Sequence, residues 1–266
     1  MSNYIKNSKN KLNTRLLRSF KKEKNKNCLS MLTCYDYQTA QMLNETDLDL
    51  ILVGDSLGNV VLGLDTTVPV TVEMMKIFSQ GVKKGAPKKF VIVDMPFGSY
   101  ATFDLAIENA IYLFQQTEVE ALKIEGAHPE TLKTIVRLTE VGIPIMGHIG
   151  LTPQSVHEMG GYYIHGKDQD SAKELLNQAI NLQRSGVFSI VLECVSPQVA
   201  KEITKELTIP TIGIGSGDDC DGQVLVINDL LKMGPSSPPK FCTPIADLYE
   251  ERKKLIERYL TSLKKN

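Results

Sequence analysis

Leu50-Ile51-Leu52-Val53-Gly54-Asp55 is a short apolar run followed by a carboxylate, and this combination decides the fold. Four other runs share the design, with one ionisable side chain at or just past the C-terminal end: Phe90-Val91-Ile92-Val93 before Asp94, Ala121-Leu122-Lys123-Ile124 before Glu125, Ile143-Pro144-Ile145-Met146 before His148, and Phe188-Ser189-Ile190-Val191-Leu192 before Glu193. Continuous apolar runs are typical of parallel strands buried on both faces. The sequence therefore predicts strands that bring ionisable groups to one edge.

Strand and helix patterns alternate along the chain. Buried β-rich runs lie near residues 29–33, 49–54, 90–94, 121–125, 143–148, 188–193, 210–214 and 223–227. Segments of helical length and periodicity lie at 37–44, 72–84, 103–117, 129–141, 171–185 and 197–207. About eight strand-helix units predict an α/β fold closed as a (β/α)₈ TIM barrel, with an open doubly wound sheet as the alternative. In both architectures ligands bind beyond the C-terminal ends of the strands.

Length and composition are those of a soluble globular protein. The 266 residues suit one barrel domain of about 250 residues, and no apolar stretch approaches the roughly 20 residues of a membrane helix. A net charge of -1 gives no basic balance for nucleic acid. We therefore expect a single domain over residues 1–266, with neither a membrane nor a nucleic acid as partner.

The N-terminal segment is basic. Nine Lys or Arg residues and the single acid Glu23 precede Cys28, without the apolar core of a secretory signal or the Arg/Ser bias of a transit peptide. We predict a solvated leader over about residues 1–27, with a short helix near Leu12 to Lys24. The five cysteines contain no Cys-x-x-Cys pair, which indicates a reducing compartment and a cytoplasmic protein.

Two later segments have predicted roles. Residues 150–168 form a long polar connection that contains Gly160-Gly161 and can cover a site as a lid. Apolar residues recur at helical spacing near the C-terminus and predict an amphipathic helix over about residues 245–263. This helix is expected to pack on the barrel or, alternatively, on a neighbouring subunit.

Three carboxylates follow successive central strands. Asp55, Asp94 and Glu125 supply only hard oxygen ligands, which select Mg²⁺ or a similar divalent cation. An acid at the end of a strand can also cap the next helix or pair with a lysine. For any one of the three acids taken alone, this is the competing interpretation. Their alignment favours a metal site formed by Asp55, Asp94 and Glu125.

Two polar residues accompany the carboxylates. Lys123 precedes Glu125 by two positions, so both side chains face the same side of a strand. A lysine inside an apolar run needs a partner, which the acids or an anionic substrate would supply; a structural ion pair and a Schiff-base nucleophile are the alternatives. Ser56 follows Asp55 and can hold an anionic oxygen, unless its segment is only a tight turn.

Glu193 and His148 are candidates for proton transfer. Glu193 ends a strongly apolar strand, so desolvation is expected to raise its pKa and suit it to act as a general base, with an ion pair as the alternative. His148 is ambiguous among a ligand, an acid or base, and a wall of the substrate pocket.

A set of ordered motifs closely resembles the ketopantoate hydroxymethyltransferase family. The segments that carry the resemblance are Met31-Leu32-Thr33-Cys34-Tyr35-Asp36-Tyr37, Val53-Gly54-Asp55-Ser56-Leu57-Gly58, Asp94-Met95-Pro96-Phe97, Lys123-Ile124-Glu125-Gly126, Gly147-His148-Ile149-Gly150-Leu151-Thr152-Pro153-Gln154, Leu192-Glu193-Cys194-Val195, Gly213-Ile214-Gly215 and Asp221-Gly222-Gln223-Val224-Leu225-Val226. It implies a barrel of the phosphoenolpyruvate-mutase and isocitrate-lyase type, assembled as a homodecamer. It also implies transfer of a one-carbon unit from 5,10-methylenetetrahydrofolate to 3-methyl-2-oxobutanoate, giving 2-dehydropantoate in pantothenate biosynthesis.

The resemblance also implies roles for individual residues. Asp55 and Asp94 would hold Mg²⁺, with Glu125 completing the site directly or through water. Ser56 and Lys123 would contact the substrate carboxylate, and Glu193 would be the proton acceptor. This fits elementary chemistry, because Mg²⁺ chelated by a 2-oxo acid stabilises the enolate formed when C3 loses its proton. The competing functions are a Mg²⁺-dependent lyase or mutase that uses no folate, and a non-catalytic metal-binding assembly protein.

Overall fold

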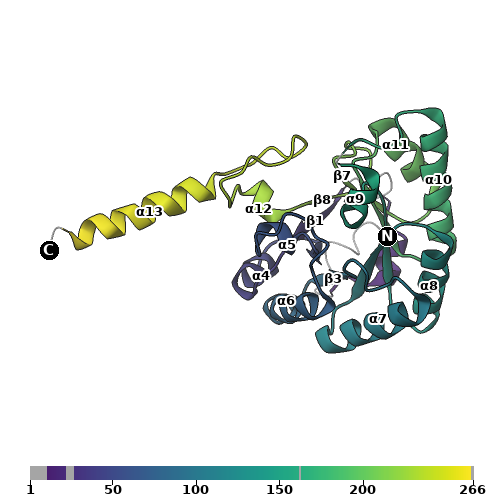
Figure 1. Ribbon diagram of the computed structural model, residues 1–266, viewed down its shortest axis with the longest axis horizontal. Helices are drawn as coiled ribbons and strands as arrows, with labels where there is room; N and C mark the ends of the chain where they lie inside the picture. Colours follow the sequence, from purple (N-terminus) through teal and green to yellow (C-terminus); the bar gives the residue numbers. More distant parts are fainter. Residues whose placement is uncertain (1–10, 22–26, 162, 265–266) are drawn as a thin grey trace. The chain divides into compact units, whose positions relative to one another are not determined.

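The computed structural model describes residues 11–21, 27–161 and 163–264, and its centre is a closed barrel of eight parallel strands that pair in chain order. The strands are β1 Leu29–Thr33, β2 Leu50–Val53, β3 Phe90–Asp94, β4 Ala121–Glu125, β5 Ile145–Gly150, β6 Ser189–Glu193, β7 Thr211–Ile214 and β8 Gly222–Leu225. This topology confirms the predicted (β/α)₈ barrel over the open sheet. Figure 1 shows α6, α7, α8 and α10 arranged around the outside of the strands.

Helices connect the strands. They are α2 Thr14–Arg18, α4 Tyr37–Asn44, α5 Leu57–Val60, α6 Val72–Gly85, α7 Phe103–Thr117, α8 Pro129–Glu140, η1 Pro153–Ser155, α9 Val156–Met159, α10 Gln169–Arg184, α11 Pro197–Glu206, α12 Ile227–Leu230 and α13 Leu248–Leu263. Asp36, Thr71 and Asp168 start α4, α6 and α10 as N-caps, because each side chain accepts a hydrogen bond from a main-chain N–H in the first turn. The six predicted helices are confirmed within two residues.

The fifth strand departs most from its predicted bounds. It was expected over residues 143–148, whereas β5 runs from Ile145 to Gly150. Pro144 explains the later start, since proline has no N–H to donate to a sheet ladder and is tolerated at the border of a strand. Its carbonyl still accepts a hydrogen bond from the N–H of Leu122.

The barrel interior is filled by side chains from the strands. Phe90 and Phe188 meet edge to face there, with ring centroids 5.6 Å apart. Further buried members of this core come from other strands and from the N-terminal segment: Leu17, Phe20, Leu29, Met31, Leu50, Leu52, Ile92, Ala121, Met146, Val191, Ile212, Ile214 and Val224. The packed interior leaves the strand ends as the place where polar groups can collect.

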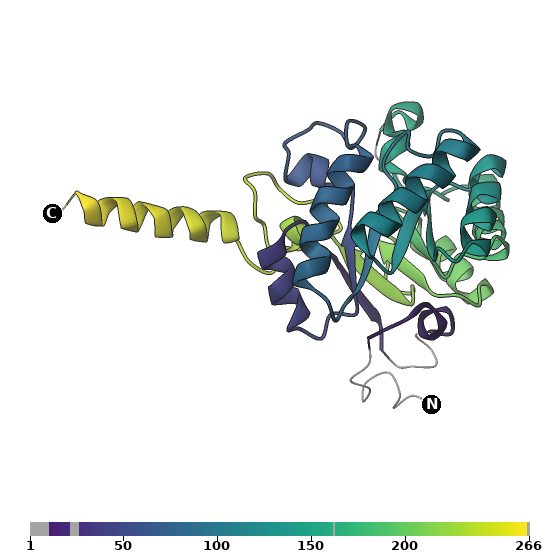
Figure 2. The ribbon, with the colours of Figure 1, turned by 90° about the horizontal axis from the view of Figure 1, so that it is seen from below.

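The N-terminal segment is part of the barrel. α2 is shorter than the helix predicted near Leu12 to Lys24, and Figure 2 shows it, in dark purple, at one end of the barrel. Leu17 and Phe20 are buried in the core, so the prediction of a solvated leader is wrong for this stretch. The prediction was based on the number of Lys and Arg residues in the segment. That number does not show whether apolar residues of the same segment are buried on one face. The rest of the predicted leader includes residues 1–10 and 22–26, which lie outside the described residues.

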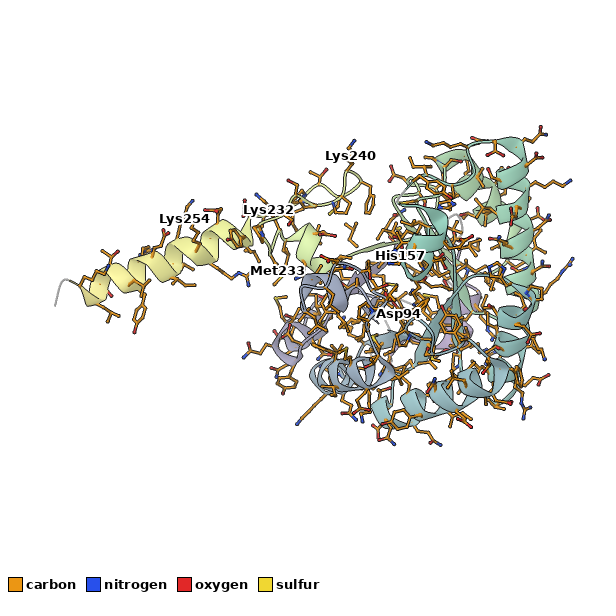
Figure 3. All side chains as sticks on the ribbon, in the orientation of Figure 1. Asp94, His157, Lys232, Met233, Lys240 and Lys254 are labelled. Atoms are coloured by element: carbon orange, nitrogen blue, oxygen red, sulfur yellow. The ribbon has the colours of Figure 1, made fainter. Side chains whose placement is uncertain are left out.

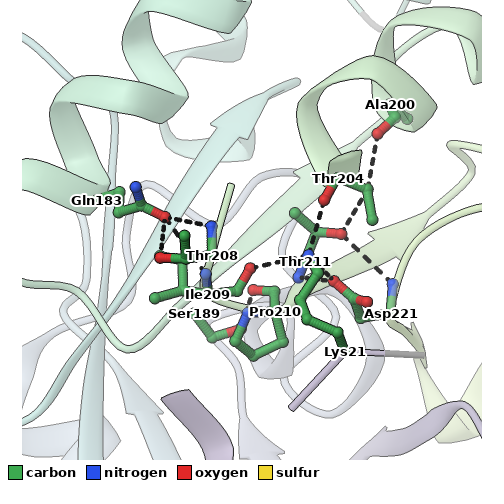
Figure 4. A network of polar contacts seen from close by, with 10 residues as sticks. All are labelled: Lys21, Gln183, Ser189, Ala200, Thr204, Thr208, Ile209, Pro210, Thr211 and Asp221. Carbon is green, nitrogen blue, oxygen red and sulfur yellow. Dashed lines mark hydrogen bonds and ion pairs between the residues drawn. The ribbon is translucent and has the colours of Figure 1, made fainter. Parts of the chain in front are cut away.

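A polar network joins this segment to α11, to the start of β7 and to Asp221, the residue before β8 (Figure 4). Lys21 Nζ donates to Asp221 Oδ2 at 2.6 Å and to the carbonyl of Thr204 at 2.7 Å. The same Asp221 oxygen accepts from the N–H of Thr211 at 3.1 Å, and Thr211 shares a 2.6 Å hydroxyl contact with Thr204. The side chains of Asp221 and Lys21 are only 2% and 14% exposed. This end of the barrel therefore has a structural role, remote from the strand ends that carry the predicted site.

We expect Asp221→Asn to lower the free energy of unfolding by about 3 kcal/mol, because it removes the negative charge from a buried ion pair with Lys21. The measurement is urea unfolding followed by circular dichroism. Asp219→Asn is the matched control, since Asp219 forms a largely exposed pair with Lys201 and should change stability by at most about 1 kcal/mol. Equal midpoints for the two variants would contradict the assigned role of the network.

The chain divides into two compact units, residues 1–224 and residues 225–266. In the second unit, the N–H groups of Ile245 and Leu248 donate to the carbonyls of Leu230 and Leu231, and Lys232 pairs with Asp247. α13 confirms the predicted C-terminal helix, and none of its residues is buried. A single domain over residues 1–266 stays a prediction. In the described part of the chain, no helix has the length and apolar character needed to cross a membrane.

Candidate active site

The register of the barrel brings the predicted residues together at the C-terminal ends of the strands. Asp94 on β3 lies beside Lys123 on β4, and Glu125 on β4 lies beside His148 on β5. Asp55 lies two residues beyond the end of β2, and its N–H donates to Asp94 Oδ2 at 3.1 Å. Figure 3 shows Asp94 within the ring of helices. Five strands thus contribute to one cluster, as their shared apolar-then-ionisable pattern predicts.

Asp55, Asp94 and Glu125 are all buried. Burial, together with repulsion from Asp94 and Glu125, raises the pKa of Asp55 well above its usual range. Burial also raises the pKa of Asp94, and Lys123 offsets only part of this. Burial alone would raise the pKa of Glu125, but His148 and Lys123 outweigh it, so that pKa is lowered. Asp55 and Asp94 are therefore the carboxylates that lack sufficient positive charge.

Lys123 lies within the cluster. Its Nζ is 2.9 Å from Asp94 Oδ1 and 3.6 Å from Glu125 Oε1. Burial lowers the pKa of Lys123, but Asp94, Glu125 and Asp55 outweigh burial and raise it above its ordinary value. The ammonium group is therefore charged at neutral pH. Its amine is thereby disfavoured as a Schiff-base nucleophile, because the unprotonated form is scarce.

His148 joins the two halves of the cluster. Its Nδ1 lies 3.2 Å from Glu125 Oε1, and its Nε2 lies 3.3 Å from Glu193 Oε2. Burial and Lys123, whose Nζ is 3.3 Å from Nδ1, lower the pKa of His148. The two glutamates outweigh them and raise the pKa to about 9, so the ring is a cation at neutral pH. The sequence left this residue ambiguous, whereas the structure places it between Glu125 and the proposed base.

Glu193 is the last residue of β6, and its side chain is 17% exposed. It is less buried than the apolar strand suggested, because it faces the mouth of the barrel beside His148. Gly150, at the end of β5, allows this arrangement: its φ is +94°, and a Cβ there would lie 2.2 Å from the carbonyl oxygen of Glu193. Only glycine tolerates both that conformation and that approach. The close pairing of β5 with β6 holds Glu193 next to His148.

Ser56 contacts the cluster's edge. Its Oγ lies 2.8 Å from the hydroxyl of Tyr35, which follows β1. Gly54 makes room for the hydroxyl of Ser56, since a Cβ at residue 54 would lie 2.8 Å from Ser56 Oγ. Ser56 therefore sits beside Asp55 with its hydroxyl held by Tyr35, and Tyr35 is a neighbour that sequence reasoning did not assign to the site.

Sequence reasoning also missed Gln154 and Tyr100 as site residues. Gln154 lies in η1, and its side-chain amide donates to Asp55 Oδ2 at 2.8 Å. Tyr100 donates its hydroxyl to Gln154 Oε1 at 2.5 Å. Uncharged residues in a connecting segment carry little sequence signal of this kind, because their partners are distant along the chain.

A cavity of about 650 Å³ adjoins the cluster and shares Glu125, Tyr100 and Gln154 with it. The predicted covering segment, residues 150–168, lines one side. In this segment the rings of Tyr163 and His165 are stacked, with centroids 4.3 Å apart. The volume is within the usual range of about 300–1,000 Å³ for small-molecule sites. The cluster therefore borders a space large enough for a second organic molecule.

The charges of the cluster suit a divalent cation. Four carboxylates, Asp55, Asp94, Glu125 and Glu193, face the two cations Lys123 and His148, so full ionisation leaves two negative charges. Among the described residues, no three His, Cys, Asp or Glu side chains form a ready-made metal site. Mg²⁺ does not require one, because it usually binds through one or two carboxylates plus waters and substrate oxygens. The oxygen-only donors and the raised pKa values of Asp55 and Asp94 fit such an ion.

Comparison with known proteins gives consistent matches over most of the chain. The sequence pattern of a family described as ketopantoate hydroxymethyltransferase matches residues 11–266. A 3-methyl-2-oxobutanoate hydroxymethyltransferase of an Exiguobacterium species is 50% identical over 237 residues, covering 89% of this chain and 85% of that protein. One from Thermosipho africanus is 47% identical over 244 residues, covering 91% of each.

Solved structures with the same fold have little sequence in common with this chain. A 2,3-dimethylmalate lyase of the PEP mutase/isocitrate lyase superfamily aligns with a TM-score of 0.60 at 14% identity, covering 95% of this chain and 87% of its own. A phosphonopyruvate hydrolase in complex with oxalate and Mg²⁺ aligns with a TM-score of 0.60 at 8% identity, covering 80% of each. These likenesses confirm the fold, a barrel of alternating strands and helices.

Proposed function

The chain belongs to the ketopantoate hydroxymethyltransferase family, and on this basis we propose that it uses 5,10-methylenetetrahydrofolate as one-carbon donor and Mg²⁺ or a similar divalent cation. It is an enzyme of pantothenate biosynthesis that transfers a hydroxymethyl unit to 3-methyl-2-oxobutanoate. The product would be 2-dehydropantoate. The observation that carries the proposal is the convergence of Asp55, Asp94, Lys123 and Glu193 at the mouth of the barrel.

Asp55 and Asp94 would hold the cation. Glu125 would complete the site through water, because His148, Lys123 and the N–H of Gln154 already engage its carboxylate. When bound, the ion would supply positive charge beside the keto and carboxylate oxygens of the acceptor and so favour loss of the C3 proton. The oxalate and Mg²⁺ in the phosphonopyruvate hydrolase complex support this reading, since oxalate presents two adjacent oxygen-bearing carbons as a 2-oxo acid does.

Lys123, Ser56 and His148 would bind the acceptor. Lys123 and Ser56 flank Asp55 and Asp94, so their ammonium and hydroxyl groups can receive the substrate carboxylate at the same place. His148 would form the side of the site between Glu125 and Glu193. Fixing the acceptor by several groups lowers the entropic cost of reaching the reactive geometry.

Glu193 would accept the C3 proton. Its carboxylate lies at the mouth of the barrel, where its ion pair with the His148 ring would limit its rotation. The enolate left on the acceptor would then form the new carbon-carbon bond with the methylene carbon of the folate as one of that carbon's two C–N bonds breaks. Water would replace the second C–N bond, which gives the hydroxymethyl group of 2-dehydropantoate and releases tetrahydrofolate. We place the folate in the cavity of about 650 Å³, because this space opens directly beside Glu125.

Assembly and location are proposed on the family resemblance. A homodecamer would bring copies of the chain together, and the exposed apolar residues of α13, among them Leu255, Ile256 and Tyr259, are available for such contacts. The five cysteines, each within the described residues, form no disulfide there, which supports a cytoplasmic location. We propose neither a nucleic acid nor a membrane as partner.

We expect purified protein, supplied with 3-methyl-2-oxobutanoate, methylenetetrahydrofolate and Mg²⁺, to form 2-dehydropantoate. The product is measured by mass spectrometry, with one reaction lacking folate and another containing EDTA. Product formation in either of these two reactions would contradict the proposed donor or cation. Exchange of the C3 hydrogen without transfer would instead favour a lyase or mutase, and complete inertness would favour a non-catalytic protein.

A further inference from the structure

Gln154 reaches from the covering segment into the carboxylate cluster. It lies in η1, beyond the end of β5, and is only 4% exposed. Its Nε2 donates to Asp55 Oδ2 at 2.8 Å and to the carbonyl oxygen of Met95 at 3.0 Å. Its main-chain N–H lies 3.3 Å from Glu125 Oε2 and donates to it. One uncharged residue thus contacts two of the three carboxylates assigned to the cation.

The hydroxyl of Tyr100 decides which end of the amide faces Asp55. It donates to Gln154 Oε1 at 2.5 Å, which leaves both amide hydrogens for Asp55 and Met95. A flipped amide would set its oxygen against the oxygens of Asp55 and Met95 and leave them without a donor. The geometry therefore admits one orientation.

We propose that Gln154 is a positioning residue that occupies Oδ2 of Asp55 and leaves Oδ1 for the cation, with Tyr100 fixing the orientation of the Gln154 amide. This inference rests on the proposed function, because it concerns the cation assigned there. Partners behind a metal ligand orient it, and their loss typically weakens metal binding or activity by about 10-fold to 100-fold. Since Gln154 belongs to the segment that lines the cavity, it also ties the position of that segment to Asp55 and Glu125.

The test measures Mn²⁺ affinity without substrate, by electron paramagnetic resonance of the free ion. We expect Gln154→Leu to raise the Kd for Mn²⁺ by about 10-fold to 100-fold. Tyr100→Phe keeps the amide but removes the bond that orients it, and we expect a smaller rise in Kd. Gln178→Leu is the matched control, because Gln178 borders the same cavity and its side-chain amide donates to Glu174 on α10. Its Kd should equal that of the unmodified protein.

The outcomes separate this proposal from the proposed function. A Kd for Gln154→Leu within twofold of the unmodified protein overturns the positioning role, as does absence of Mn²⁺ binding by the unmodified protein. If Gln154→Leu does not fold, as judged by its thermal transition, Tyr100→Phe decides: an unchanged Kd overturns the proposal. If the affinities shift as expected but no 2-dehydropantoate is formed, the positioning role stands and the proposed transfer reaction fails.

Discussion

Glu193→Gln is expected to abolish exchange of the C3 hydrogen of 3-methyl-2-oxobutanoate while leaving the binding of the acceptor and of Mg²⁺ intact. The amide has nearly the shape of the carboxylate, and its oxygen can keep the same place beside His148 Nε2, which lies 3.3 Å from Glu193 Oε2. It cannot accept the C3 proton at neutral pH. Loss of a general base typically costs about 10²-fold to 10⁴-fold in rate, so both exchange and transfer should fall by this range.

Proton nuclear magnetic resonance in D₂O measures this exchange directly, because the C3 signal disappears as deuterium enters. The matched control is Glu202→Gln, an exposed glutamate on α11, the helix that follows β6. It should exchange at the rate of the unmodified protein. Exchange by Glu193→Gln at that same rate would rule out Glu193 as the proton acceptor and leave the His148-Glu193 contact as a structural ion pair.

The sequence was sufficient to predict the barrel because its strands are short, apolar and buried on both faces. The local composition of Leu50–Val53 and Phe90–Val93 predicts strands. The periodicity of apolar residues in the segments that connect the strands predicts helices. Parallel strands then carry the residues that follow them to one end of the barrel. This is why Asp55, Asp94 and Glu125 were predicted as neighbours without any knowledge of their contacts.

The parts of the site that the sequence missed depend on contacts across the barrel. Gln154 is 99 positions from Asp55 and carries no charge, so no local pattern connects the two. His148 was predicted to end its strand, whereas β5 continues for two more residues, and its role depends on which carboxylates face its two nitrogens. The burial of Leu17 and Phe20 was missed for a similar reason, since both pack against strand residues that are distant along the chain. Register and closure of the barrel settle such pairs, and sequence patterns do not report them.

Lys123→Met is expected to have the second largest effect, on both stability and turnover. Methionine fills a similar volume, but it leaves Asp94 and Glu125 without the ammonium group that lies 2.9 Å and 3.6 Å from their oxygens. Removing one partner from a buried ion pair costs about 3–5 kcal/mol. Turnover should fall as well, since the acceptor loses the cation assigned to its carboxylate, and the KM for 3-methyl-2-oxobutanoate should rise.

The destabilisation by Lys123→Met should depend on pH in a defined direction. Burial already raises the pKa values of Asp55 and Asp94 in the folded protein, and loss of Lys123 raises them further. A carboxyl group with a raised folded pKa stabilises the fold below its unfolded pKa, about 3.9 for aspartate, and loses this contribution as pH rises through the folded value. The variant should therefore be closest to the unmodified protein at acidic pH and fall further below it as pH rises.

Mg²⁺ should reverse part of this loss, because a cation bound by Asp55 and Asp94 replaces the missing positive charge and stabilises the folded state by mass action. Thermal unfolding across pH 4 to 9, with and without MgCl₂, measures both effects. Lys133→Met is the control, since Lys133 pairs with Glu130 on the exposed face of α8 and should shift stability by at most about 1 kcal/mol at any pH. A deficit for Lys123→Met that neither grows with pH nor shrinks with Mg²⁺ would mean that Asp55 and Asp94 do not depend on Lys123 for charge. The cation would then have to be sought elsewhere on the barrel.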